Sequence, residues 1–141
     1  MKFLIILYNF FLLSFPVNAN TFTGEYSLIK GPKNCPDGEI HIKDNRLMFG
    51  TRHIWMIGEA DKGESKETVE GGCGYLTSYE KNSSKILIKT IRSSCPNKSE
   101  NAVVLEELQL ANNNLTYSFK SDSDNKTTNS FKCEYKKSAA K

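Results

Sequence analysis

Beyond residue 21 the chain consists of short segments in which apolar and polar side chains alternate. Ile40 and Ile42 are separated by His41, and Leu115, Tyr117 and Phe119 are separated by single polar residues. A period of two is typical of β-strands that bury one face. About nine strands are predicted on this basis. They span residues 22–30, 40–43, 47–49, 53–57, 73–79, 85–91, 102–110, 115–119 and 131–135.

Two polar stretches interrupt this pattern. Residues 58–72 contain four Gly and a single sizeable apolar side chain, Val69, and are expected to form a mobile loop or a hairpin with a polar outer part. Residues 121–129 are expected to form a polar loop. Residues 102–110 are rich in helix formers, but the alternating partner segment 115–119 follows directly and favours a strand.

An all-β fold follows, because no helical pattern is present to cover a sheet. Such a sheet buries one face against itself, as a closed barrel or as a sandwich. Consecutive hairpins favour a single-domain antiparallel up-and-down β-barrel of about eight to nine strands, with the β-sandwich as the alternative. The barrel is expected to span residues 20–135, followed by a disordered basic tail over residues 136–141.

The N-terminal segment, residues 1–19, is predicted to be a signal peptide. Lys2 precedes an apolar run over residues 3–15, and Ala19 ends a short stretch suited to cleavage. The run is shorter than the ~20 apolar residues of a transmembrane helix. We therefore expect an exported, soluble protein, secreted or periplasmic, that does not insert into a membrane after cleavage.

The cysteine content agrees with export from the cytosol. The chain has four cysteines, at positions Cys35, Cys73, Cys95 and Cys133. An even number in a small exported protein predicts two disulfides. The cysteines form no C-x-x-C motif and no spacing with histidine that is typical of zinc sites, so no metal site is expected.

Hairpin geometry favours one of the three pairings that four cysteines allow. If Glu80 lies opposite Lys85 across a turn over residues 81–84, Cys73 lies opposite Arg92 and Cys95 is nearby. A bulge or bend would bring Cys73 and Cys95 within bonding distance. The remaining two cysteines, Cys35–Cys133, then join the first and last parts of a closed barrel.

Charge and residue content exclude several functions. Nineteen Lys and Arg against sixteen Asp and Glu leave a net charge of +3, too small and scattered for a nucleic-acid partner. His41 faces away from Ile40 and Ile42, and His53 shares a face with Trp55, where a structural hydrogen bond is expected. The sequence has no G-x-S-x-G motif, and paired cysteines leave no thiol nucleophile. We expect no enzymatic activity, no catalytic residues and no cofactor.

Aromatic side chains on the predicted inner face are the candidate ligand-binding residues. They are Tyr26, Trp55, Tyr75, Tyr79 and Tyr117. A buried tyrosine hydroxyl needs a hydrogen-bond partner, so these side chains either bond to each other, hold water or meet a ligand. The alternative is that they only fill the core.

The segment Thr23-Gly24-Glu25-Tyr26 on the first strand, followed by an all-strand meander, resembles the lipocalin and calycin group, whose first strand carries G-x-W. Tyr26 stands at the position of the Trp. The resemblance implies a barrel that holds a small apolar ligand at one mouth.

The expected function is a non-enzymatic, monomeric β-barrel that binds a small apolar or amphipathic ligand. The first alternative is a secreted protein-interaction or inhibitor module with a filled core, whose loops contact a protein partner. The second is a structural envelope protein. An interior cavity above about 300 Å³ beside Tyr or Trp would favour ligand binding. A filled core with an exposed apolar patch would favour the interaction module.

Overall fold

The computed structural model describes residues 22–44, 46–51, 53–124 and 128–138. These residues form one antiparallel sheet of ten strands and one 3₁₀ turn, η1 (Lys98–Glu100). The strands are β1 (Gly24–Lys30), β2 (Glu39–Lys43), β3 (Arg46–Phe49), β4 (His53–Met56), β5 (Lys62–Thr68), β6 (Gly74–Lys81), β7 (Lys85–Ser93), β8 (Ala102–Ala111), β9 (Asn114–Ser123) and β10 (Thr128–Lys137). Within the described part of the chain, no helix has the length and apolarity needed to cross a lipid bilayer.

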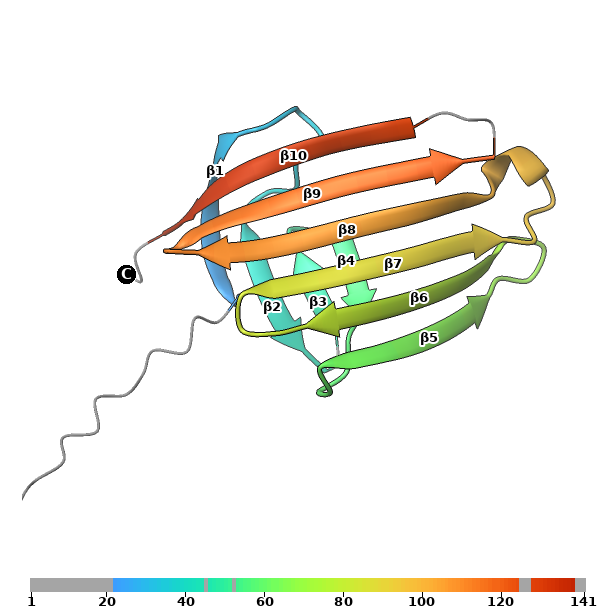
Figure 1. Cartoon of the computed structure of the whole chain (residues 1–141), viewed down its shortest axis with the longest axis horizontal. Helices are drawn as coiled ribbons and strands as arrows, with labels where there is room; N and C mark the ends of the chain where they lie inside the picture. The colour runs from blue at the N-terminus through green and yellow to red at the C-terminus, as the bar shows by residue number, and fades with distance from the viewer. Residues whose placement is uncertain (1–21, 45, 52, 125–127, 139–141) are drawn as a thin grey trace, which may run out of the picture.

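The sheet curls into a nearly closed barrel, which confirms the predicted fold class with slightly more strands than expected. The strand order is β4-β3-β2-β1-β10-β9-β8-β7-β6-β5, so the first strand, β1, pairs with the last, β10. Figure 1 shows β1 to β4 facing β5 to β10 across the interior. The end strands β4 and β5 do not pair with each other, and they border the one seam in the sheet.

Inward-facing side chains fill much of the interior. Eleven of them are less than 2% exposed: Ile40, Leu47, Phe49, Ile57, Ile86, Ile88, Leu108, Leu115, Tyr117, Cys133 and Tyr135. The ring of Phe49 lies edge-on to that of Tyr117, with centroids 5.7 Å apart. Burial of apolar surface on this scale is the main stabilising contribution to the fold.

Strand β5 lies inside the stretch 58–72, for which a loop or a hairpin was expected. The hairpin is the correct alternative, because β5 pairs with β6 along its whole length. Its inward positions are Gly63, Ser65 and Glu67, so apolar alternation could not reveal it. A Cβ at Gly63 would lie 2.7 Å from the ring of Tyr79, so a glycine is required there.

The expected loop over residues 121–129 is also mostly strand. β9 continues to Ser123 and β10 begins at Thr128, with Thr128 paired to Asp122. Backbone pairing and the hydrogen bond from the Thr128 hydroxyl to Asp122 extend the hairpin beyond its apolar part. At its other end β10 continues to Lys137, two residues beyond the expected boundary of the domain.

The predicted β6–β7 register was wrong by two residues. Glu80 lies opposite Leu87 rather than Lys85, because the turn is shorter than expected. The Asn82 side chain accepts hydrogen bonds from the backbone N–H groups of Ser84 and Lys85 and fixes a tight turn. A shift of two residues keeps every side chain on its predicted face.

Both predicted disulfides are confirmed. Cys35 and Cys133 are joined with a Cα–Cα distance of 5.9 Å and tie the segment after β1 to β10. Cys73 and Cys95 are joined with a Cα–Cα distance of 4.1 Å just beyond the ends of β6 and β7.

Candidate ligand pocket

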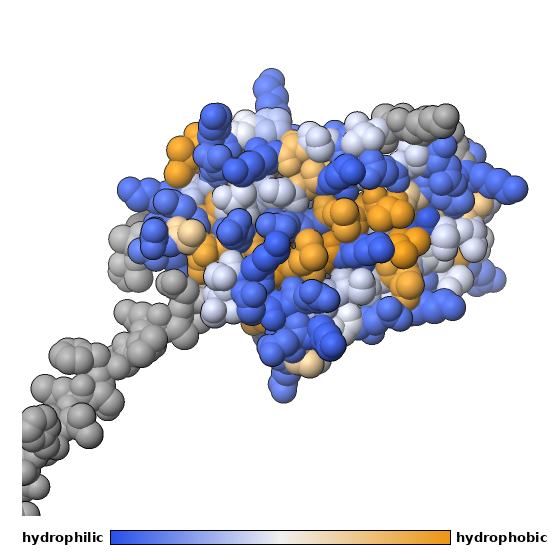
Figure 2. Space-filling model, viewed as in Figure 1, coloured by the Kyte–Doolittle hydropathy of each residue, from blue (hydrophilic) through white to orange (hydrophobic). Residues whose placement is uncertain are grey.

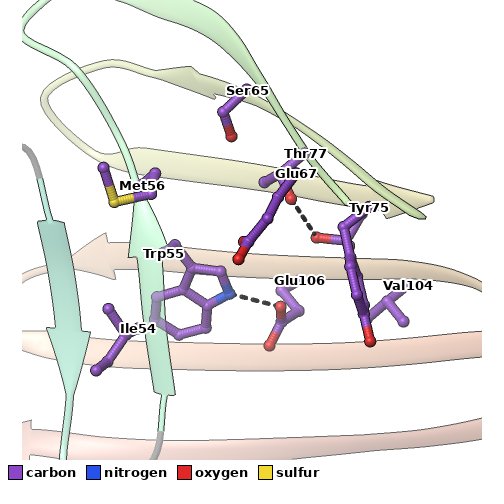
Figure 3. A pocket seen from close by; sticks show the side chains of 10 residues that line it. Ile54, Trp55, Met56, Ser65, Glu67, Tyr75, Thr77, Val104 and Glu106 are labelled. Carbon is purple, nitrogen blue, oxygen red and sulfur yellow. Dashed lines mark hydrogen bonds between the residues drawn. The ribbon is translucent and has the colours of Figure 1, made fainter. Parts of the chain in front are cut away.

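A pocket of about 360 Å³ lies at the seam between β4 and β5. Its walls come from β4, β5, β6, β7 and β8. The lining residues are Ile54, Trp55, Met56, Ser65, Glu67, Tyr75, Thr77, Thr90, Val104 and Glu106. Figure 3 shows Trp55 extending from the edge strand β4 toward the side chains of the strands opposite it, whereas Ile54 and Met56 lie on the other side of β4.

The pocket exists because the interior changes from apolar to polar along the strands. On β7, the buried Ile86 and Ile88 are followed two residues later by Thr90. On β8, the polar part holds Glu106 and the apolar part begins at Leu108. Small polar side chains fill less volume than Leu or Ile, so the polar half of the barrel is left partly open.

Glu106 is the principal polar group of this interior. Its side chain is only 8% exposed, and it is the one buried charged residue in the described part of the chain. The indole N–H of Trp55 donates to Glu106 Oε2 over 2.6 Å, and the hydroxyl of Tyr117 donates to Oε1 over 2.6 Å. Hydrogen bonds to a carboxylate are short and strong, so they fix both the carboxylate and the Trp55 ring.

The tyrosine hydroxyls of the core are satisfied within the protein. Tyr26 donates to the carbonyl of Phe22 and Tyr135 to that of Pro36, while Tyr117 donates to Glu106. Burial raises the pKa of each of these three, here called the core tyrosines. The negative charge of Glu106 raises the pKa of Tyr117 further.

Two of the five candidate ligand-binding residues, Trp55 and Tyr75, line the pocket. The other three, Tyr26, Tyr79 and Tyr117, lie in the hydrophobic core, where filling the core was the alternative expectation. The Tyr79 hydroxyl accepts a hydrogen bond from the backbone N–H of Gly58. Tyr117 supports the pocket through its hydrogen bond to Glu106, and Tyr79 stabilises the β4–β5 connection through Gly58, whereas Tyr26 is bonded to Phe22.

Tyr75 differs from the other tyrosines. It is half-buried, and its hydroxyl has no hydrogen-bond partner among the described residues. Beside it, the hydroxyls of Thr77 and Thr90 bond to each other over 3.2 Å. The Tyr75 hydroxyl thus remains available to a molecule in the pocket.

Glu67 and Glu106 were not anticipated as site residues. The sequence pattern could have indicated Glu106, because this residue occupies an inward position of the alternating segment that contains Val104, Leu108 and Leu110. A charged residue at such a position marks either a polar network or a ligand site. Glu67 had no such signal, because β5 lacks apolar alternation.

The described residues offer little for metal binding or histidine chemistry. Cys73, Cys95 and Glu100 lie close together, but both sulfur atoms belong to a disulfide and are not thiolate ligands. His41 is paired with Glu39 on the surface, at 2.8 Å. The side chain of His53 lies outside the described residues.

Comparison with protein-family models, curated proteins and solved structures gives no match for this chain. The conclusions on function therefore rest on the pocket itself.

Proposed function

We propose that this protein is an exported, non-enzymatic binding protein that takes a small amphipathic molecule into the pocket at the β4–β5 seam. The observation that carries the proposal is the pocket of about 360 Å³ beside Trp55. Small-molecule sites begin at about 300 Å³ and combine apolar walls with a few fixed polar groups.

The lining has this mixed character. Val104 and the rings of Trp55 and Tyr75 supply apolar surface, and Ile54 and Met56, on the other face of the edge strand β4, add exposed apolar surface at its rim, with 56% and 48% of their area exposed. The hydroxyls of Ser65 and Tyr75 form no hydrogen bond among the described residues and can pair with a ligand. A wholly apolar ligand would leave these groups unpaired, so the amphipathic alternative is favoured over the apolar one.

Export is part of the same proposal. The two disulfides suit an oxidising compartment outside the cytosol. The signal peptide expected over residues 1–19 lies outside the described residues. The lipocalin-like character is likewise proposed, supported by the barrel and by the G-x-Y segment on β1.

A protein-interaction module remains the second candidate, and one surface favours it. Figure 2 shows apolar surface on the outer face of the long strands. Leu76, Ile91 and Val103 lie in one cross-strand row there and are partly exposed, with Leu87 and Leu105 beside them. Such a patch is a feature of interaction sites.

The pocket is tested with its own reporter, because Trp55 is the single tryptophan of the chain. Titration with the neutral amphiphile 4-phenyl-1-butanol should change Trp55 fluorescence with saturation. Val104→Phe fills the pocket and should abolish this response. Val103→Phe, one residue away and facing outward, is the matched control and should preserve it.

Native mass spectrometry of the exported protein provides an independent test. A co-purifying molecule of small mass that is lost in Val104→Phe and retained in Val103→Phe supports the proposal. Equal responses of the two variants, with no bound molecule in any preparation, would overturn it and favour the interaction module.

A further inference from the structure

We infer that two copies of this protein pair through the outer face of strands β5 to β9, in place of the monomer expected from the sequence. Figure 2 shows apolar surface on this face, bordered by hydrophilic side chains. The inference does not depend on the pocket, because the side chains of this face point away from the interior. It is carried by the order of residues across the strands, which is complementary to its own reverse.

One cross-strand row forms the middle of this face. Its three central side chains are apolar and partly exposed, and a basic and an acidic residue stand at its opposite ends. From β5 to β9 the row consists of Lys66, Leu76, Ile91, Val103 and Asp122, each directly opposite the next. Partly exposed apolar side chains gathered in this way are typical of a protein-protein contact.

A two-fold axis parallel to β7, in the plane between two facing sheets, reverses this row in the second copy. Ile91 then meets Ile91, and Leu76 meets Val103. At the two ends Lys66 meets Asp122, so each dimer contains this ion pair twice. Dimers of identical chains use one patch on both copies in this manner, and sheets that pack face to face keep their strands nearly aligned.

The neighbouring row has the same complementarity at its ends. From β5 to β9 it consists of Glu64, Ser78, Lys89, Leu105 and Lys120, so Glu64 meets Lys120 of the second copy. Among the described residues, the side chains of Glu64 and Lys66 form no ion pair or hydrogen bond. Lys120 and Asp122 bond only across their own strand, at 2.9 Å. A second copy therefore offers partners to the unpaired charges of β5.

The third row contains one contact between like charges. Leu87 meets Leu87 there, but Glu80 meets Glu107. Lys89 of each copy lies on the axis, diagonal to both carboxylates, and Lys85 already bonds to Glu107 at 2.9 Å. These lysines offset the repulsion between the two carboxylates.

The balance of charge favours a second copy over a strongly charged partner. The chain carries a net charge of +3, but the positive and negative side chains of the three rows are equal in number. They are Lys62, Lys66, Lys89 and Lys120 against Glu64, Glu80, Glu107 and Asp122. A face without net charge attracts neither an acidic nor a basic partner over a distance, whereas its own reverse matches it at both ends.

The test is sedimentation velocity of the protein with both disulfides intact, at neutral pH. The mass should shift from monomer to dimer as the concentration rises from about 5 to about 500 μM. Ile91→Lys places two lysines against each other on the axis and should weaken the dimer about ten-fold or more. Thr116→Lys is the matched control, because it adds the same charge on the outer face of β9, opposite Gln109 and outside the three rows. It should leave the dimer unchanged.

A charge exchange tests the orientation of the two copies. Lys66→Glu opposes Asp122 with a like charge at both ends and should weaken the dimer about five-fold. Combining it with Asp122→Lys restores opposite charges and should return the affinity to that of the parent protein. Circular dichroism confirms that each variant is folded.

The outcomes separate this inference from the proposed function. A parent protein that stays monomeric at every concentration would overturn the inference and leave the apolar patch to a different protein. A dimer that Ile91→Lys weakens no more than Thr116→Lys would place the contact elsewhere and overturn it as well. Loss of the dimer in Ile91→Lys without rescue by the exchanged charges would overturn the two-fold arrangement. Val104→Phe fills the pocket from inside the barrel and should not change dimerisation, so the two proposals succeed or fail independently.

Discussion

Tyr117→Phe tests whether the Glu106 network stabilises the polar half of the barrel. The substitution removes the hydroxyl that donates to Glu106 Oε1 over 2.6 Å and leaves the ring in place. A hydrogen bond to a charged, buried group contributes about 1.5–3 kcal/mol, so the free energy of unfolding should fall by about that amount. Tyr135→Phe is the matched control, because Tyr135 is equally buried but donates to the neutral carbonyl of Pro36. It should cost about 0.5–1.5 kcal/mol.

The assay is urea unfolding at neutral pH with both disulfides intact, followed by circular dichroism and by Trp55 fluorescence. The midpoint should shift while the slope stays unchanged, because the buried surface is the same. A cost for Tyr117→Phe no greater than that for Tyr135→Phe would refute the reasoning.

A double-mutant cycle with Glu106→Gln isolates the pair. The coupling energy between the Tyr117 hydroxyl and the Glu106 carboxylate should be about 1–2 kcal/mol, as expected for contacting polar groups in a network. A coupling near zero would mean that the hydroxyl stabilises the fold through other contacts.

Two further predictions concern stability. Replacing both cysteines of the Cys35–Cys133 bridge, whose sequence separation is 98, should cost about 4.7 kcal/mol by the chain-entropy relation. Replacing both in the Cys73–Cys95 bridge, whose separation is 22, should cost about 3.4 kcal/mol, and the reverse order in thermal unfolding would contradict this. The core tyrosines have pKa values raised above 10.0, so the fold keeps protons that the unfolded chain releases. Stability should therefore hold below about pH 10 and fall as the pH rises above it. Absorbance at the tyrosinate band should show these groups ionising together with loss of the circular dichroism signal, and their ionisation in an intact barrel would count against the prediction.

Part of the candidate site was predictable from local pattern. Trp55 and Tyr75 were identified because alternation places them on inward faces and because aromatic side chains line many pockets. The same reasoning included Tyr26, Tyr79 and Tyr117, which the structure places in the core. Alternation gives the face of a residue, but it does not say whether the space in front of that face is filled.

Glu106 and Glu67 also show that local alternation alone does not identify the residues of the pocket. Glu106 is inward by alternation, yet only the fold brings the Trp55 indole, 51 positions away in the chain, to its oxygen atom. Glu67 lies on a strand that exists through backbone pairing with β6 rather than through apolar side chains. A strand without apolar alternation has no signature in the sequence.

The sequence by itself determined the all-β class, most strand positions, the inward faces and both disulfide pairings, because period-two alternation and chain connectivity are local properties. The tertiary structure alone decided the seam between β4 and β5, the extra strand β5 and the polar pocket between them. These depend on how ten strands curl and where the curl stops short of closure. That geometry is set by packing between residues distant in the chain, which local pattern does not encode.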